Sequence, residues 1–249
     1  MSDATANKRM IRIGMLTPSS NTVLEPVTTA MLSGLDDVSV HFSRFRVTAI
    51  GLDDAALAQF DDRAMLEAAG LLADAKVDVI AWNGTSAGWL GLDKDRRLCE
   101  KITAETGIAA STSVLSLFDI MRARGESRIG LVTPYTADVQ EKIIARFADE
   151  GVDVAAEAHF GLRDNFSFAT VSREQLAAAV EAVGQSAPQA ISILCTNLAG
   201  APLVDGLEKR FSIPIHDSIA TTVWGALVAA GQPPSRVAGY GALFAEGAA

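Results

Sequence analysis

The heptapeptide RIGMLTP at residues 12–18 decides the fold, because it recurs as RIGLVTP at residues 128–134. Each copy is a short apolar run that ends in Thr-Pro and leads into a polar turn and a helix-like stretch. An apolar run bounded by turn residues is typical of a buried strand in a parallel sheet. The recurrence indicates an internal duplication of a strand–turn–helix unit.

Two further pairs of segments repeat in the same order. VIAWNGTS at residues 79–86 resembles ISILCTN at residues 191–197, and each continues into an Ala-Gly turn. A weaker pair joins residues 107–117 to residues 213–223. Three matches in one order favour true duplication over the alternative, which is independent use of the same strand–turn–helix pattern.

Apolar periodicity predicts alternating strands and helices. This alternation favours an α/β fold in which helices cover both faces of a parallel sheet. The expected halves are residues 1–118 and 119–217, with residues 218–249 packed back on the first half. Without a Gly/Ser/Pro linker, we expect the halves to share a tight interface. The strands are expected at 11–16, 38–47, 77–83, 128–133, 152–159, 190–195 and 213–215, and the helices at 21–34, 54–75, 94–106, 113–124, 136–150, 172–186, 201–211 and 218–230.

The composition excludes several classes of partner. The 249 residues carry a net charge of -9, and Lys and Arg do not cluster, so we expect no nucleic-acid partner. No apolar run reaches the ~18 residues of a membrane span, and residues 1–12 show no apolar signal-peptide core. We therefore expect a cytoplasmic protein with reduced thiols and no membrane partner. Two Cys and three scattered His give no metal-ligand spacing.

Four polar segments are expected at the carboxyl ends of the strands, where ligands gather in parallel α/β folds. They are residues 17–21, 84–86, 133–135 and 195–197. The duplication places two sets of hydroxyl, amide and turn backbone groups face to face across a cleft. Such groups suit a carboxylate or an enolate oxygen.

Cys195 is the leading catalytic candidate. It ends a buried strand, whereas the duplicated position holds Gly84. A thiol pKa of ~8.5 falls near helix N-termini or cations, and such a thiol can donate or accept a proton at neutral pH. One thiol opposite a bare position predicts proton delivery to one face, as after a decarboxylation. The alternative is a packed core cysteine.

Other polar residues support a site for a small carboxylate. Thr85 and Ser86 can form an oxyanion cradle or merely cap a turn. Tyr135 can supply a phenolic donor or lie on the surface. Asn21 opens the first helix, as an N-cap or as part of an anion site. Asn165 lies in a loop long enough to reach the cleft.

The remaining candidate features of the sequence are less specific. Phe166 and Phe168 can wall the cleft or belong to the core. We interpret Cys99, in a charged helix, as structural. The adjacent residues 216–217, His-Asp, match a catalytic pair by type only. No Gly-rich phosphate loop follows a strand, so we expect no nucleotide.

A family resemblance follows from these residues. The run GMLTPSSNT at 14–22 looks like the N-terminal motif of maleate isomerases, and residues 84–86 and Cys195 match two thiol positions of that family. The chain resembles the aspartate/glutamate racemase superfamily, in the branch of maleate cis-trans isomerases and arylmalonate decarboxylases. It is also similar to racemase-like proteins of ectoine utilisation. The resemblance implies two pseudo-symmetric flavodoxin-like lobes with parallel sheets, an active site in the cleft between them, and no cofactor.

The resemblance also assigns roles to residues. Arylmalonate decarboxylases keep only the second cysteine and have Gly-Thr-Ser at the first position, as at residues 84–86. Cys195 then protonates the enediolate left after loss of carbon dioxide. The substrate carboxylate and oxyanion contacts implied by the two activities fall on Asn21, Gly84, Thr85, Ser86, Tyr135, Asn165 and Thr196.

Three functions remain open at this stage. The leading hypothesis is single-cysteine decarboxylation and protonation of a small carboxylic or dicarboxylic acid. The second is a maleate-isomerase-like, racemase or epimerase activity in ectoine-type solute catabolism. The third is a ligand-binding protein without catalysis, since fold alone does not fix function. A homo-oligomer is compatible with all three.

Overall fold

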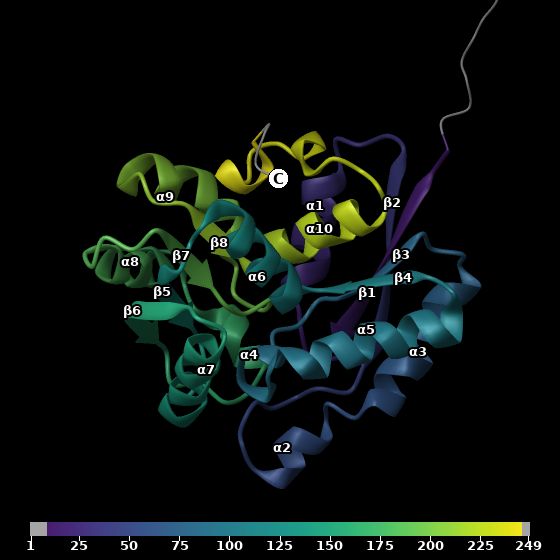
Figure 1. The fold of residues 1–249 in the computed structure, drawn as a ribbon, viewed down its shortest axis with the longest axis horizontal. Helices are drawn as coiled ribbons and strands as arrows, with labels where there is room; N and C mark the ends of the chain where they lie inside the picture. The colour runs from purple at the N-terminus through teal and green to yellow at the C-terminus, as the bar shows by residue number, and fades with distance from the viewer. Residues whose placement is uncertain (1–8, 246–249) are drawn as a thin grey trace, which may run out of the picture.

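Two four-stranded parallel sheets form the frame of the protein (Figure 1). The computed structural model describes residues 9–245, so residues 1–8 and 246–249 of the expected first half lie outside the described residues. The first sheet has the order β2-β1-β3-β4 and the second has the order β6-β5-β7-β8. The strands are β1 (Ile11–Pro18), β2 (Val38–Phe45), β3 (Val79–Trp82), β4 (Ala109–Thr112), β5 (Arg128–Thr133), β6 (Asp153–His159), β7 (Ala190–Ile193) and β8 (Ile215–Asp217).

The two sheets repeat the same topology and register. Strands β1 and β5, which carry the two heptapeptides, are central, and each pairs with a following strand at an equivalent residue. Ile13 pairs with Val79 in the first sheet, and Ile129 pairs with Ala190 in the second. The predicted α/β fold with two lobes and parallel sheets is confirmed.

Glycine in the heptapeptide has a packing reason in both lobes. A Cβ on Gly14 would lie 3.1 Å from Leu72, and one on Gly130 would lie 3.1 Å from Val183. Leu72 belongs to helix α3 and Val183 to helix α8, so each glycine lets a covering helix approach its central strand.

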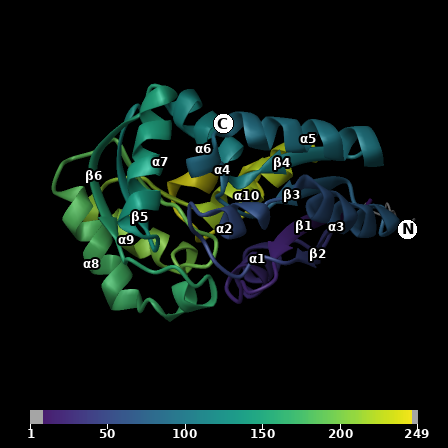
Figure 2. The same cartoon turned by 90° about the horizontal axis from the view of Figure 1, so that it is seen from below.

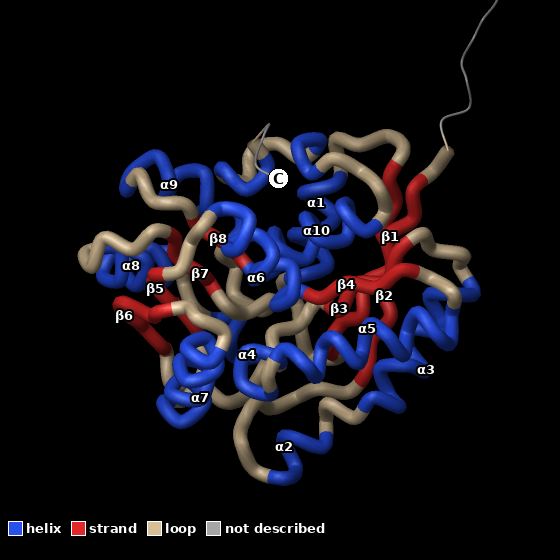
Figure 3. The backbone as a smooth tube through the Cα atoms, viewed as in Figure 1, coloured by secondary structure: helices blue, strands red, loops and turns tan. Residues whose placement is uncertain are grey.

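The helices surround both sheets, as the blue segments around the red strands show in Figure 3. The predicted helix 54–75 is divided into two helices, each of which begins after a capping aspartate. The Asp53 side chain accepts the N–H of Ala56, and that of Asp61 accepts the N–H of Arg63. The α-helices are α1 (Leu24–Leu32), α2 (Asp54–Ala58), α3 (Asp62–Asp74), α4 (Ala87–Leu90), α5 (Leu92–Thr106), α6 (Ser113–Arg124), α7 (Ala137–Asp149), α8 (Arg173–Gly184), α9 (Val204–Phe211) and α10 (Ser218–Ala229).

The lobes meet along an apolar interface. One cluster of buried side chains runs from Leu16 and Trp82 of the first sheet to Leu131 and Cys195 of the second lobe. Helix α10, which follows the second sheet, packs against α6, β4 and β3, and it lies between the two sheets in Figure 2. The expected boundary at residue 118 falls inside α6. The division of the chain into lobes therefore stays a prediction in its details.

No helix between residues 9 and 245 has the length and apolar character that a bilayer crossing requires. The same range holds no cluster of three His, Cys, Asp or Glu side chains that suits a metal ion.

Candidate active site

The carboxyl ends of β1, β3, β5 and β7 converge on a small cavity between the lobes. Its volume is about 20 Å³, which is room for about one water molecule. The first lobe contributes the turn after β3, and the second contributes the turns after β5 and β7. The cavity is lined by Pro18, Val47, Ile50, Phe60, Trp82, Gly84, Thr85, Ser86, Trp89, Tyr135, Asn165, Cys195 and Thr196.

Cys195 follows β7, and its thiol lies at the cavity wall with only 3% of the residue exposed. The N–H of Asn197 donates to its Sγ at 3.3 Å, and the Tyr135 side chain interacts with the thiol from the other lining turn. Burial, with a smaller contribution from the negative charge of Asp217, raises the thiol pKa to about 12 although Asn197, Tyr135 and Leu198 lower it. The pKa of Cys195 is therefore raised, and not lowered as near a cation or a helix N-terminus. The thiol carries its proton at neutral pH, which suits a proton donor.

Tyr135 joins the two halves of the site. Its hydroxyl lies 2.6 Å from Oγ1 of Thr85, and both side chains are buried. Burial raises the pKa of Tyr135 well above its ordinary value. The phenol is thus a neutral donor that contacts the Gly84–Ser86 turn on one side and the thiol on the other.

Asn21 and Thr196 form a polar contact between the lobes. Nδ2 of Asn21 donates to Oγ1 of Thr196 at 3.2 Å, and this hydroxyl donates to the backbone oxygen of Asn83 at 3.1 Å. Oδ1 of Asn21 also accepts the N–H groups of Val23 and Leu24 at the entrance to α1, where the N-cap residue itself is Val23. Asn21 stands behind Thr196 and is not among the cavity-lining residues.

Asn165 reaches the cavity from the loop after β6. Its Nδ2 donates to Oγ of Ser20 at 2.8 Å, and its backbone oxygen accepts Nδ2 of Asn197 at 2.5 Å. Its backbone N–H donates to the oxygen of Thr48 at 2.9 Å. Asn165 therefore holds the second lobe against the first.

Contacts beside Ile50 join a loop of the first lobe to a loop of the second. The N–H of Ile50 donates to the oxygen of Arg163 at 2.9 Å. The Arg163 guanidinium is paired with the Asp53 carboxylate, and Ala49 forms an isolated antiparallel bridge with Asp164. We name residues 48–53 and 163–165 the interlobe loops.

Six apolar or aromatic lining residues were missed by sequence reasoning. They come mostly from loops and short helices, whose apolar residues look like ordinary core residues in the sequence. The missed residues are Pro18, Val47, Ile50, Phe60, Trp82 and Trp89.

The two phenylalanines expected either in the cleft wall or in the core differ in burial. Phe166 is 56% exposed, whereas Phe168 is buried and packs edge-on against Tyr135.

Two other sequence candidates lie outside the cavity. Cys99 is in α5, and burial raises its thiol pKa to about 12. His216 contacts Glu126 at 2.6 Å, and Asp217 instead caps helix α10. The His-Asp neighbours therefore do not form a catalytic pair with each other.

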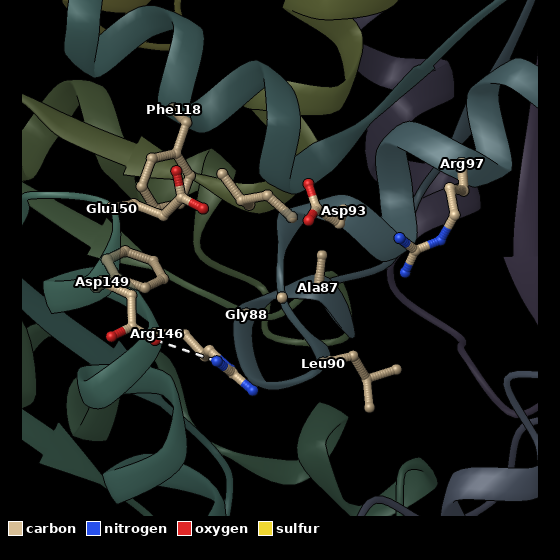
Figure 4. Close-up of a pocket in the computed structure, with 12 residues that line it drawn as sticks. Ala87, Gly88, Leu90, Asp93, Arg97, Phe118, Arg146, Asp149 and Glu150 are labelled. Carbon is tan, nitrogen blue, oxygen red and sulfur yellow. Dashed lines mark hydrogen bonds and ion pairs between the residues drawn. The ribbon is translucent and has the colours of Figure 1, made fainter.

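A larger cavity of about 270 Å³ is lined by residues of α4, α5, α6 and α7 (Figure 4). It contains the Arg146–Asp149 ion pair, and no thiol or hydroxyl side chain lines it. It therefore lacks the groups that distinguish the small cavity. Its lining residues are Ala87, Gly88, Leu90, Gly91, Leu92, Asp93, Arg97, Phe118, Arg146, Phe147, Asp149 and Glu150.

Two similar parallel lobes around a thiol-bearing cavity define an enzyme class with the aspartate/glutamate racemase-like fold. The sequence profile described as arylmalonate decarboxylase matches residues 13–244, so the chain belongs to that family.

Known relatives span nearly the whole chain. The maleate isomerase of Nocardia farcinica is 29% identical over 248 residues, which cover 96% of this chain and 97% of the relative. The arylmalonate decarboxylase of Bordetella bronchiseptica is 24% identical and covers 94% and 96%. A solved mutant of the Nocardia farcinica isomerase with a covalently bound succinylcysteine intermediate is 26% identical, covers 94% and 98%, and has a TM-score of 0.85. The chain is thus an enzyme of the lyase or isomerase type.

Proposed function

We propose that this enzyme decarboxylates a small malonate-type acid and that Cys195 protonates the resulting enediolate. The observation that carries the proposal is one buried thiol in a cavity where Gly84 occupies the equivalent position of the other lobe. A two-faced proton exchange needs a second acid–base group, and Tyr135 is the other titratable side chain among the lining residues. Tyr135 already contacts the same sulfur.

The reaction follows from the chemistry of the lining. The bond between the α-carbon and one carboxylate breaks, and its electron pair moves into an enediolate as carbon dioxide leaves. The S–H proton of Cys195 passes to the α-carbon, and the thiolate takes a proton from water afterwards. Thr85, Ser86 and Tyr135 provide neutral donors for the carboxylate that stays.

The apolar lining favours departure of the other carboxylate. Val47, Ile50 and Phe60 carry no hydrogen-bonding side chain, and no Lys or Arg lines the cavity. A carboxylate against this wall loses hydration without gaining a partner, and it loses its charge when it leaves as carbon dioxide.

Isomerisation of a dicarboxylate is the second candidate, because Asn165 adds an amide to the lining. Solvent deuterium separates the two reactions. Decarboxylation of a substituted malonate releases carbon dioxide and leaves one new C–D bond of fixed handedness. Isomerisation or epimerisation conserves the mass of the carbon skeleton.

The direct test uses Cys195→Ala and Cys195→Ser. We expect turnover of phenylmalonate or methylmalonate in D₂O to fall by about 10²–10⁴-fold, with an unchanged Tm, when followed by NMR. Cys99→Ser is the matched control, because it removes the other thiol, in α5. Wild-type turnover by Cys195→Ala would refute the assignment, and conversion of maleate without release of carbon dioxide would favour the isomerase.

A further inference from the structure

Trp82 fills space beside Gly84. It ends β3, is 1% exposed, and packs its ring against Phe45 with centroids 5.1 Å apart. A Cβ on Gly84 would lie 2.1 Å from Cζ2, 2.4 Å from Cη2 and 2.5 Å from Cε2 of the Trp82 ring. Real Cβ atoms essentially never approach closer than 3.0 Å. Any side chain at position 84, a thiol included, therefore requires the buried indole to move.

The indole N–H of Trp82 lacks a protein partner. Nε1 is buried and makes no hydrogen bond. It is bonded to Cε2, one of the three ring atoms nearest the Gly84 Cβ position. Trp82 also lines the cavity. An indole N–H can only donate, and buried donors are nearly always paired.

We propose that Trp82 determines the specificity of this site in two ways. Its ring occupies the space of a thiol at position 84, and its N–H donates to an oxygen of the bound carboxylate or enediolate. The inference rests on the proposed function for the identity of the ligand, whereas the steric part stands without it. The consequence is a site for a prochiral malonate, protonated from the Cys195 side alone, and not for a racemase substrate that needs acid–base groups on both faces.

The steric part is tested by a double-mutant cycle that needs no substrate. Gly84→Cys in the wild-type background should lower Tm by roughly 5 °C, because it overpacks the site. In the Trp82→Ala background, the same substitution should change Tm by less than about 2 °C. Equal Tm losses in the two backgrounds would overturn the claim that Trp82 occupies the thiol space.

The donor part is tested by Trp82→Phe, which keeps an aromatic ring and removes the N–H. We expect kcat/KM for phenylmalonate to fall by about 10–100-fold, the loss typical of a hydrogen bond to a charged group. Trp224→Phe is the matched control, because the Trp224 N–H is also buried and unpaired but lies in a different core cluster outside the cavity lining. Equal kcat/KM values for the two variants would overturn the donor role.

Hydrogen exchange at the α-carbon of 2-phenylpropionate in D₂O tests the consequence. Gly84→Cys combined with Trp82→Ala should exchange this hydrogen, whereas wild type and Gly84→Cys alone should not. Exchange by Gly84→Cys alone, at the rate of the double variant, would overturn the exclusion. Absence of wild-type turnover of malonates would refute the proposed function and the donor role, and the Tm cycle would still decide the steric part.

Discussion

Removal of the Tyr135 hydroxyl is expected to weaken both the fold and the reaction. In Tyr135→Phe, the Thr85 hydroxyl loses its partner at 2.6 Å while remaining buried. A buried polar group left without a partner costs about 1–3 kcal/mol, which corresponds to a Tm lower by roughly 3–10 °C for a chain of this size. Tyr135 also lowers the pKa of the Cys195 thiol. Without its hydroxyl the thiol is a weaker acid, so kcat should fall.

Differential scanning calorimetry and steady-state turnover of phenylmalonate measure the two effects. Tyr240→Phe is the control, because Tyr240 is the chain's other tyrosine and is not a cavity residue. Thr85→Val combined with Tyr135→Phe should recover most of the Tm, since loss of both partners leaves no orphaned hydroxyl. A Tyr135→Phe protein with wild-type Tm and wild-type kcat would refute this reasoning.

Three further predictions concern pH, packing and thiol reactivity. Burial raises the pKa of Asp217 to about 7, above its ordinary 3.8, so the protonated carboxyl stabilises the fold below about pH 4 and this stabilisation is lost as the pH rises through 7. The Tm of Asp217→Asn, relative to that of wild type, should therefore be higher at pH 8 than at pH 5. A Tm difference that does not change with pH would contradict this prediction. Gly130→Ala should lower the free energy of unfolding in urea by about 1–3 kcal/mol, because its Cβ would crowd Val183. Gly206→Ala, in α9 with nothing within 4 Å of the added Cβ, should raise it by about 0.5–1 kcal/mol. Equal effects of the two substitutions would exclude the packing explanation. Iodoacetamide at pH 7.5 should leave Cys195 and Cys99 unmodified in the folded protein and label both in urea, because both thiol pKa values are near 12; rapid labelling of Cys195 in the folded protein, seen by intact mass, would show that the thiol is ionised.

The repeat in the sequence predicts most of the frame. It places β1 and β5 as equivalent central strands, and it brings the Gly84 and Cys195 turns to one cavity. Strand β4 was missed because Ala109–Thr112 has four residues and is mostly unburied, so no continuous apolar run marks it. The break between α2 and α3 was missed because apolar spacing continues through Phe60 while Asp61 starts a new helix.

The chemistry of the cavity was less predictable. The rise in the thiol pKa of Cys195 depends on burial and on Asp217, which only the folded structure brings together. The ring of Trp82 over Gly84 depends on a side-chain rotation that strand periodicity does not encode. A cytoplasmic location, a homo-oligomer and a role in ectoine utilisation stay predictions.

The interlobe loops carry a kinetic consequence. A substituted malonate is larger than the cavity of about 20 Å³, and we expect it to enter where residues 48–53 meet residues 163–165. Separation of these two segments breaks two backbone hydrogen bonds and the Asp53–Arg163 ion pair. Turnover that changes with solvent viscosity and salt would identify this separation as a slow step of the cycle.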